Sequence, residues 1–255
     1  MTDPYGEIAA YYDLIYGTDI DYEGESQGLL RIFKENRVKR VLDIGCGTAS
    51  HLICLGRSGF EGTGVDISEK MIQVGRKKAE RENLRINLKP GDMNDIKGIG
   101  LSGSFDAVIS LYAPGLNTGP DRLAHTLRDI HPLLNDGGVL IFNLMNADCP
   151  FFDPAAPDLS FDGAEAGGIK AVWFYQTVVK VKERQQHLSA VYLIEDGGGV
   201  SMFVHHHRIT TFTLAEVKEL LTECGFQSRS VFGSPAGLTP FQGEEPAMWI
   251  LAGKI

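Results

Sequence analysis

The sequence predicts an α/β fold: a doubly wound, mostly parallel sheet of seven strands, with a small antiparallel insertion before the last helix. Three observations lead to this prediction. Strand-like and helix-like segments alternate through residue 145. A glycine-rich turn follows the first strand-like segment. Between Pro150 and Thr211 the alternation stops, and β-like runs follow one another without a helix between them.

The first half of the chain is predicted from helical spacing, apolar runs and one helix cap. Ser68 stands where a side-chain oxygen would cap the helix that follows the second strand. The predicted elements are, in order, a helix over 22–35, strands over 41–44 and 62–66, a helix over 69–78 and a strand over 85–88.

The second half of the regular pattern contains both a turn and a capping box. Asn135, Asp136 and Gly137 predict a turn, and Thr213 with Glu216 has the spacing of a capping box. The predicted elements are a strand over 105–111, a helix over 121–134, a strand over 138–143, a helix from Thr213 to near Gly225, and strands over 228–232 and 248–252.

The segment between the fifth strand and the last helix predicts an inserted cover. Residues 150–168 are rich in Pro, Gly, Asp and Ala and predict a lid or loop. Three β-like runs follow, over 171–181, 188–194 and 200–211. We therefore predict a main domain from residues 1–149 and 212–255, and an insertion, 150–211, that covers a substrate site at the carboxyl edge of the sheet.

The glycine turn indicates which ligand this edge binds. Gly45 and Gly47 allow the backbone to approach a ligand closely, because neither carries a Cβ. A dinucleotide turn has a third glycine where this chain has Ser50. The carboxylate of Asp43 would repel a pyrophosphate but attract a sulfonium and an ammonium. The turn therefore favours S-adenosylmethionine and disfavours a nicotinamide-dependent oxidoreductase.

Two further acids follow strands at the same edge of the predicted sheet. Asp66 lies about twenty residues beyond the turn, at the spacing of an acid that binds both ribose hydroxyls. Asp92 follows the third strand and could accept a hydrogen bond from the adenine amino group, while Met93 packs against the ring. Together with the turn, these acids predict a complete nucleoside site.

The motifs D-I-G-C-G-T, G-V-D-I-S, G-D-M-N-D and F-D-A-V-I-S occur in this order. They resemble those of the class I S-adenosylmethionine-dependent methyltransferases, over residues 5–145. The resemblance implies a Rossmann-like sheet and S-adenosylhomocysteine as product, and Ala49 departs from it where most members have a third glycine. The implied cofactor-binding residues are Tyr12, Asp43, Gly45, Cys46, Gly47, Asp66, Ile67, Met71, Asp92, Met93, Leu111 and Tyr112.

A narrower resemblance lies at the two ends of the chain. The run Tyr12 to Tyr16 and the run His207 to Thr213 resemble N-methyltransferases that dimethylate amino groups on nucleotide-linked sugars. In that group the second tyrosine of the first run lies near the transferred methyl, which implies this place for Tyr16. The expected function is N-methylation of an amino sugar or similar amine. A small-molecule O-methyltransferase and a non-catalytic cofactor-binding protein remain alternatives.

The chemistry of methyl transfer indicates candidate catalytic residues. An amine must lose its proton before it attacks, so we expect Tyr16 to position the acceptor and His206 or His207 to handle the proton. His205 and His207 would share a strand face, but no third ligand at metal spacing follows, and no metal is expected. Asn117, after strand four, is an expected polar contact to substrate. That segment lacks the Asn/Asp-Pro-Pro-aromatic signature that holds planar amides and nucleobases.

Composition and charge limit the classes of substrate and partner that we expect. The 255 residues carry 24 basic and 33 acidic side chains, a net charge of −9, which argues against nucleic acid as substrate. No signal peptide or membrane-spanning run is evident, so a cytoplasmic protein is expected. The four cysteines show no C-x-x-C pairing and are expected to be reduced. The expected partner is a small-molecule acceptor, and both a monomer and a homodimer remain open.

Overall fold

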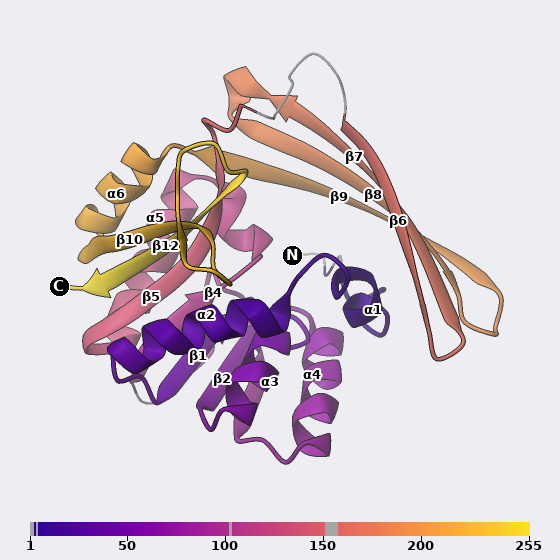
Figure 1. Ribbon diagram of the computed structural model, residues 1–255, viewed down its shortest axis with the longest axis horizontal. Helices are drawn as coiled ribbons and strands as arrows, with labels where there is room; N and C mark the ends of the chain where they lie inside the picture. Colours follow the sequence, from indigo (N-terminus) through magenta and orange to yellow (C-terminus); the bar gives the residue numbers. More distant parts are fainter. Residues whose placement is uncertain (1–2, 4, 102–103, 151–157) are drawn as a thin grey trace.

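The computed structural model describes residues 3, 5–101, 104–150 and 158–255, and contains a mostly parallel main sheet joined by strand pairing to an antiparallel one (Figure 1). The first five strands of the main sheet run parallel, whereas the sixth is antiparallel to both of its neighbours. In spatial order they are β3 (Ile86–Pro90), β2 (Glu61–Asp66), β1 (Arg40–Ile44), β4 (Phe105–Ser110), β5 (Leu134–Asn146), β12 (Ala247–Lys254) and β10 (Phe226–Ser234). A two-residue strand, β11 (Thr239–Pro240), pairs with β10. The predicted doubly wound α/β sheet is confirmed.

Helices cover both faces of this sheet because alternate residues of its strands point to opposite sides. Leu42, Val108 and Phe142 pack with α5 and α6, whereas their neighbours Val41 and Ile109 pack with α2, α3 and α4. The helices are α1 (Tyr12–Tyr16), α2 (Tyr22–Glu35), α3 (Ser50–Arg57), α4 (Glu69–Arg81), α5 (Pro120–Ile130) and α6 (Leu214–Glu223), with 3-10 turns η1 (Pro114–Thr118), η2 (His131–Leu133) and η3 (Val181–Glu183).

Local sequence signals fix most of the helix ends. Ser68 accepts from the Met71 N–H at the start of α4, and both halves of the Thr213–Glu216 capping box are formed at α6. The helix predicted over 121–134 ends at Ile130 and continues as the 3-10 turn η2, because Pro132 has no backbone N–H to extend the α-helical hydrogen bonds. The turn predicted at residues 135–137 lies inside β5, where the pairing with β4 shifts register.

The insertion forms a larger sheet than expected. Four antiparallel neighbours make up this inserted sheet: β6 (Asp158–Ala166), β7 (Ile169–Lys180), β8 (Gln185–Glu195) and β9 (Val200–Phe212). The lid or loop predicted over 150–168 is wrong for β6, and residues 151–157 of that prediction lie outside the described residues. Nearly every β6 residue is exposed, so its sequence lacks the apolar alternation that marks a half-buried strand.

The inserted sheet has an inward face and an outward face. The inward face forms a third core with the N-terminal segment, in which Trp173 and Tyr192 pack near Ile8 and Ile15. Figure 1 shows α1 between this face and α4. The outward face leaves apolar side chains exposed, among them Phe161 at 76% and Met202 at 66%. The N-terminal segment is therefore held between the two sheets.

No helix among the described residues is long and apolar enough to cross a membrane.

Candidate functional site

The glycine turn joins β1 to α3 at the carboxyl edge of the main sheet. Gly45 and Gly47 both have positive φ, at 80° and 54°, which glycine adopts at little cost. The N–H groups of Gly45 and Cys46 donate to the Val65 carbonyl, at 2.8 and 3.0 Å, and bind the turn to β2. A Cβ added at Gly47 would meet no atom within 4 Å, so this side of the turn faces open space.

Asp66, at the end of β2, is bonded to the turn. Its carboxylate accepts from the Gly47 N–H at 2.8 Å and from the Ser68 N–H at 2.9 Å. Burial raises the pKa of Asp66, and these two backbone hydrogen bonds oppose that rise. The acid is thereby fixed in one orientation beside Gly47.

The other predicted acids have different surroundings. Asp43 is only 3% exposed, and its pKa is raised well above its usual range by burial and then by the nearby Asp66. Asp92 follows β3 and accepts from the Asn94 backbone N–H at 2.9 Å. Met93 reaches back toward the turn, since a Cβ at either Gly45 or Gly115 would press on its side chain.

A pocket opens above the turn. The N-terminal segment, the turn with the start of α3, and the residues after β4 line it together. Its lining residues are Tyr12, Ile20, Tyr22, Gly45, Cys46, Gly47, Thr48, Ser50, His51, Leu111 and Tyr112.

An ion pair fastens α1 over this pocket. The Lys78 ammonium on α4 donates to the Asp13 carboxylate at 2.7 Å and to the Ser50 hydroxyl at 2.9 Å. The Thr48 hydroxyl donates to the same carboxylate. Asp13 therefore ties the N-terminal segment both to the turn and to α4.

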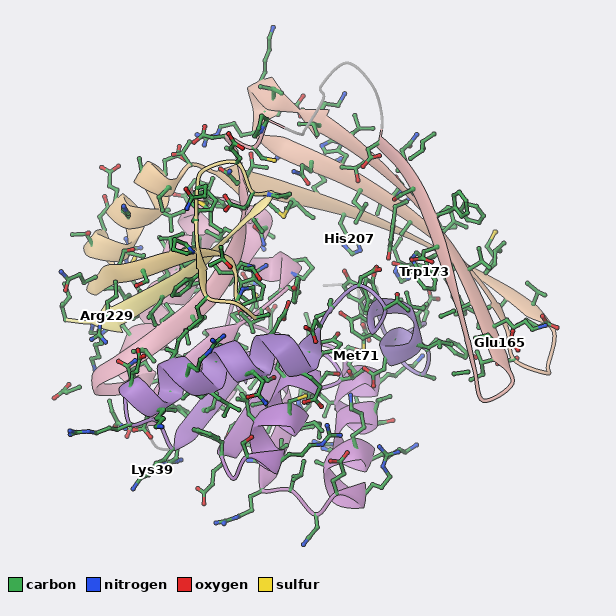
Figure 2. The ribbon with its side chains drawn as sticks, viewed as in Figure 1. Lys39, Met71, Glu165, Trp173, His207 and Arg229 are labelled. Carbon is green, nitrogen blue, oxygen red and sulfur yellow. The ribbon has the colours of Figure 1, made fainter. Side chains whose placement is uncertain are left out.

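Aromatic rings connect the pocket to the inserted sheet. Tyr12 contacts Tyr16 at a centroid distance of 4.5 Å, and the Tyr16 hydroxyl is hydrogen-bonded to that of Tyr192 on β8 at 2.7 Å. Tyr5 stacks on His207 of β9 at 5.2 Å. Figure 2 shows His207 and Trp173 pointing from the inserted sheet toward the main sheet and α1.

Several buried polar atoms on the inward face have no hydrogen-bond partner among the described residues. They are the Tyr175 hydroxyl, Gln186 Nε2, both ring nitrogens of His205, and His207 Nε2. An unpaired buried polar group usually costs about 1–3 kcal/mol. Ordered water or a polar ligand at this face would supply the missing partners.

The titratable groups of this face are held neutral. Burial lowers the pKa values of His205 and His207, and the neighbouring histidines act in the same direction. Burial also raises the pKa of Tyr16 far above its usual range. At neutral pH the face therefore presents hydroxyls and uncharged imidazoles.

Comparisons with known proteins agree with this geometry. Residues 41–138 match the family model described as a methyltransferase domain. The chain is an S-adenosylmethionine-dependent methyltransferase, with the methyltransferase domain over residues 41–138. This methyltransferase uses S-adenosylmethionine as its methyl donor, as the cofactor prediction stated.

Relatives extend the similarity through the inserted sheet. A dTDP-3-amino-3,6-dideoxy-alpha-D-glucopyranose N,N-dimethyltransferase of Streptomyces fradiae is 27% identical over 251 residues, 95% of this chain and 92% of that protein. A dTDP-3-amino-3,4,6-trideoxy-alpha-D-glucopyranose N,N-dimethyltransferase of Streptomyces venezuelae is 26% identical, over 92% of this chain and 96% of that one.

Solved structures share the fold. An S-adenosylmethionine-dependent methyltransferase from Clostridium acetobutylicum superposes with a TM-score of 0.80 over 99% of both chains, at 16% identity. An amino pentose methyltransferase from Micromonospora echinaspora, with S-adenosylmethionine bound, gives a TM-score of 0.72 at 20% identity, over 96% of this chain and 97% of that one.

Most of the predicted site residues lie at the carboxyl edge of the main sheet of this methyltransferase. The residues below are placed differently. His206 is exposed on the outward face, where its Nδ1 is hydrogen-bonded to the Ser189 hydroxyl at 3.0 Å. It therefore points away from the inward face that carries His205 and His207, because successive strand residues point to opposite faces. Met71 is buried at 2% exposure in the first turn of α4, whereas Ile67 is 39% exposed. Asn117 is also buried, and its side-chain oxygen accepts from the Met145 N–H.

Sequence reasoning missed residues whose faces depend on strand register. Tyr175, Gln186 and Tyr192 point inward with His205, and their period of two along β7, β8 and β9 could have grouped them. Tyr5 was missed because it lies before the run Tyr12 to Tyr16, which carries the resemblance to sugar N-methyltransferases. In the described ranges, no group of three or more His, Cys, Asp or Glu side chains is arranged to hold a metal ion.

The residues around the turn fit the cofactor that the family uses. The open space above Gly47, the oriented carboxylate of Asp66 and the pocket over the turn form a cradle for a nucleoside with a polar tail.

Proposed function

We propose that this methyltransferase transfers methyl groups to the amine of a small polar acceptor, most specifically an amino sugar linked to a nucleotide. The observation that carries the proposal is the set of unpaired polar atoms on the inward face of the inserted sheet. The tyrosines of the N-terminal segment connect this face to the pocket over the glycine turn. The acceptor would bind between the inserted sheet and that segment.

The cofactor would occupy the edge of the main sheet. Asp66 would bind the ribose hydroxyls, and the turn Gly45 to Gly47 would lie along the cofactor. Asp92 and Met93 would hold the adenine, while Tyr12, Leu111 and Tyr112 would surround the methionine part. When bound, S-adenosylmethionine supplies a methyl group on a sulfonium: a neutral amine can attack the methyl carbon, and S-adenosylhomocysteine leaves as the S–C bond breaks.

The acceptor would need to lose a proton before or during this attack. A neutral imidazole can accept that proton, and His207 has an unpaired Nε2 on the inward face. His205 has two unpaired nitrogens and is the second candidate. The Tyr16–Tyr192 hydroxyl pair would position the acceptor rather than ionise, because burial raises both pKa values.

The two N,N-dimethyltransferases align over nearly the whole chain, which includes the inserted sheet. Their names describe amino sugars carried on dTDP, and this supports an amine as acceptor here. It also supports the division that we propose: residues 1–149 with 212–255 hold the cofactor, and 150–211 cover the acceptor.

A labelled-methyl assay tests the proposal. The purified protein would be incubated with S-adenosylmethionine carrying a labelled methyl group and with matched pairs of dTDP-sugars, in which one member has an amino group and the other a hydroxyl. We expect label on the amino sugars, with one or two added methyl groups by mass spectrometry. Transfer to the hydroxyl partners alone would make the enzyme an O-methyltransferase. Binding of cofactor without transfer to any acceptor would contradict the proposal.

A further inference from the structure

Glu25, His51 and Tyr112 form a hydrogen-bonded cluster at one end of the pocket over the glycine turn, in which Tyr112 is 40% exposed. Glu25 on α2 and His51 on α3 are each 6% exposed. One carboxylate oxygen of Glu25 lies 2.8 Å from His51 Nε2, and the other accepts from the Tyr112 hydroxyl. An ionised carboxylate only accepts hydrogen bonds, so Nε2 carries a proton and donates it. The orientation of the imidazole is therefore fixed by Glu25.

Tyr112 is held in an unfavourable backbone conformation to complete this cluster. Its φ is 52°, in the left-handed region, and its N–H donates to the Asn143 side chain at 2.7 Å. The ring lies over His51 at a centroid distance of 6.3 Å and contacts the edge of Trp249. A strained residue maintained by several contacts points to a functional constraint rather than to packing alone.

His51 also stands at an uncapped helix start. It is the second residue of α3, whose N-cap residue, Ala49, provides no side-chain hydrogen bond. The first N–H groups of a helix point outward and favour an anion. His51 lines the pocket beside Ser50 and Thr48, and its Nδ1 has no partner among the described residues. The His51 imidazole and the first N–H groups of α3 therefore face the same part of the pocket.

The Lys78 ammonium, which also lies near this pocket, is already engaged. Lys78 has three N–H donors, and Asp13, Ser50 and Thr48 accept from it at 2.7, 2.9 and 3.3 Å. Its charge is also paired with the Asp13 carboxylate. With Nε2 donating to Glu25, the His51 ring donates from Nδ1 as well when it carries both protons, and the adjacent Glu25 carboxylate offsets the positive charge of that form. In that form His51 offers its second N–H to an anionic group in the pocket.

We propose that His51, oriented by Glu25, binds the carboxylate of the methionine part of S-adenosylmethionine. His51 is then a cofactor-recognition residue, and Glu25 is a positioning residue that acts through it. This inference rests on the proposed cofactor site over the glycine turn and is independent of the proposed acceptor.

Three ligands separate the chemical groups involved. S-adenosylhomocysteine carries the carboxylate and the ammonium, its decarboxylated analogue keeps the amine alone, and methylthioadenosine carries neither. Calorimetric titration would give the dissociation constant of each ligand for the wild type, His51→Phe, Glu25→Gln and His125→Phe. His125 is an exposed histidine on α5 that faces Asp129, so its variant is the matched control for loss of a histidine beside an acid.

We expect the wild type to bind S-adenosylhomocysteine at least about tenfold more tightly than its decarboxylated analogue, because a charge-assisted hydrogen bond is lost. In His51→Phe this preference disappears, while methylthioadenosine binds as before. Glu25→Gln retains part of the preference, and His125→Phe retains all of it. Unaltered methylthioadenosine binding shows that the variants fold.

Two outcomes would overturn the proposal alone, and a third would overturn the cofactor site as well. A preference for the carboxylate that survives in His51→Phe would assign its recognition elsewhere. A preference set by the amine instead would assign the cluster to the ammonium group. Failure of the wild type to bind all three ligands would instead overturn the cofactor site itself, and with it this inference.

Discussion

The cofactor side and the acceptor side of this methyltransferase differ in how their polar groups are satisfied. At the glycine turn, the carboxylate of Asp66 is bonded to two backbone N–H groups, and the turn is bonded to β2. On the inward face of the inserted sheet, His205 and Tyr175 keep buried polar atoms without partners among the described residues. The first region is bonded within the protein, whereas the second, in our proposal, is completed by the acceptor.

This difference matches the demands of the two ligands. One cofactor serves the whole family, so a rigid, preformed site lowers the cost of binding it. The acceptor varies between methyltransferases, and the residues that we propose to contact it lie on a sheet with its own core. Changing that sheet can alter the acceptor while the main sheet is retained.

The largest expected effect is on the free energy of unfolding, and it compares the two faces of the inserted sheet. Trp173 is 1% exposed on the inward face, whereas its neighbour Phe174 is 45% exposed on the outward face. We expect Trp173→Ala to lower the free energy of unfolding by about 3–5 kcal/mol, because it empties the core shared with the N-terminal segment. Phe174→Ala should cost much less. Urea unfolding of both variants measures the difference, and equal losses would contradict the assignment of the faces.

The second prediction concerns the cofactor side. Asp66→Ala removes the acid at the ribose position and leaves the Gly47 and Ser68 N–H groups without it. Affinity for S-adenosylhomocysteine should fall by about 1.5–3 kcal/mol, the range for hydrogen bonds to a charged group. Asp95→Ala, which alters an exposed acid that bonds only its own turn, is the control. Calorimetry that finds equal affinities for the Asp66 variant and the wild type would remove Asp66 from the site.

The third prediction concerns the pH dependence of the acceptor side. Burial lowers the pKa of His207 in the folded protein, whereas an unfolded histidine titrates near its usual pKa of about 6.5. Between these two values the unfolded state binds more protons, so the free energy of unfolding falls as the pH falls. His207→Gln should reduce this pH dependence. Urea unfolding at about pH 7 and about pH 5.5 tests it, and an unchanged slope would contradict a buried neutral His207.

The smallest effect is expected at Ala49, which has a φ of 63° where most family members have glycine. Ala49→Gly would relieve left-handed strain of about 1–2 kcal/mol and lose a buried methyl group worth about 0.8 kcal/mol. These terms nearly cancel, so unfolding and cofactor affinity should change little. A large loss of affinity would show that the methyl group itself contacts the cofactor.

The sequence predicted the main sheet well because its signals are local. The turn at Gly45, the acid at Asp66 and the Ser68 cap are each specified by a few neighbouring residues. The helix predicted over 22–35 matches α2 at both ends.

The inserted sheet and the cluster around His51 were harder to predict. Which of His205, His206 and His207 points inward depends on the pairing of β9 with β8, and the exposed β6 shows no apolar alternation. The contact between Glu25 and His51 joins two helices across 26 positions of the chain, and neither residue is marked by its own neighbours.

The most direct test of the contrast between the two sides uses Tyr175→Phe. This variant removes one unpaired hydroxyl from the inward face and nothing from the cofactor side. We expect no loss in the free energy of unfolding, unchanged affinity for S-adenosylhomocysteine, and a KM for the amine acceptor that rises by the equivalent of about 0.5–1.5 kcal/mol. A loss of stability with an unchanged KM would show that the hydroxyl serves the fold, and would contradict an acceptor site completed by its ligand.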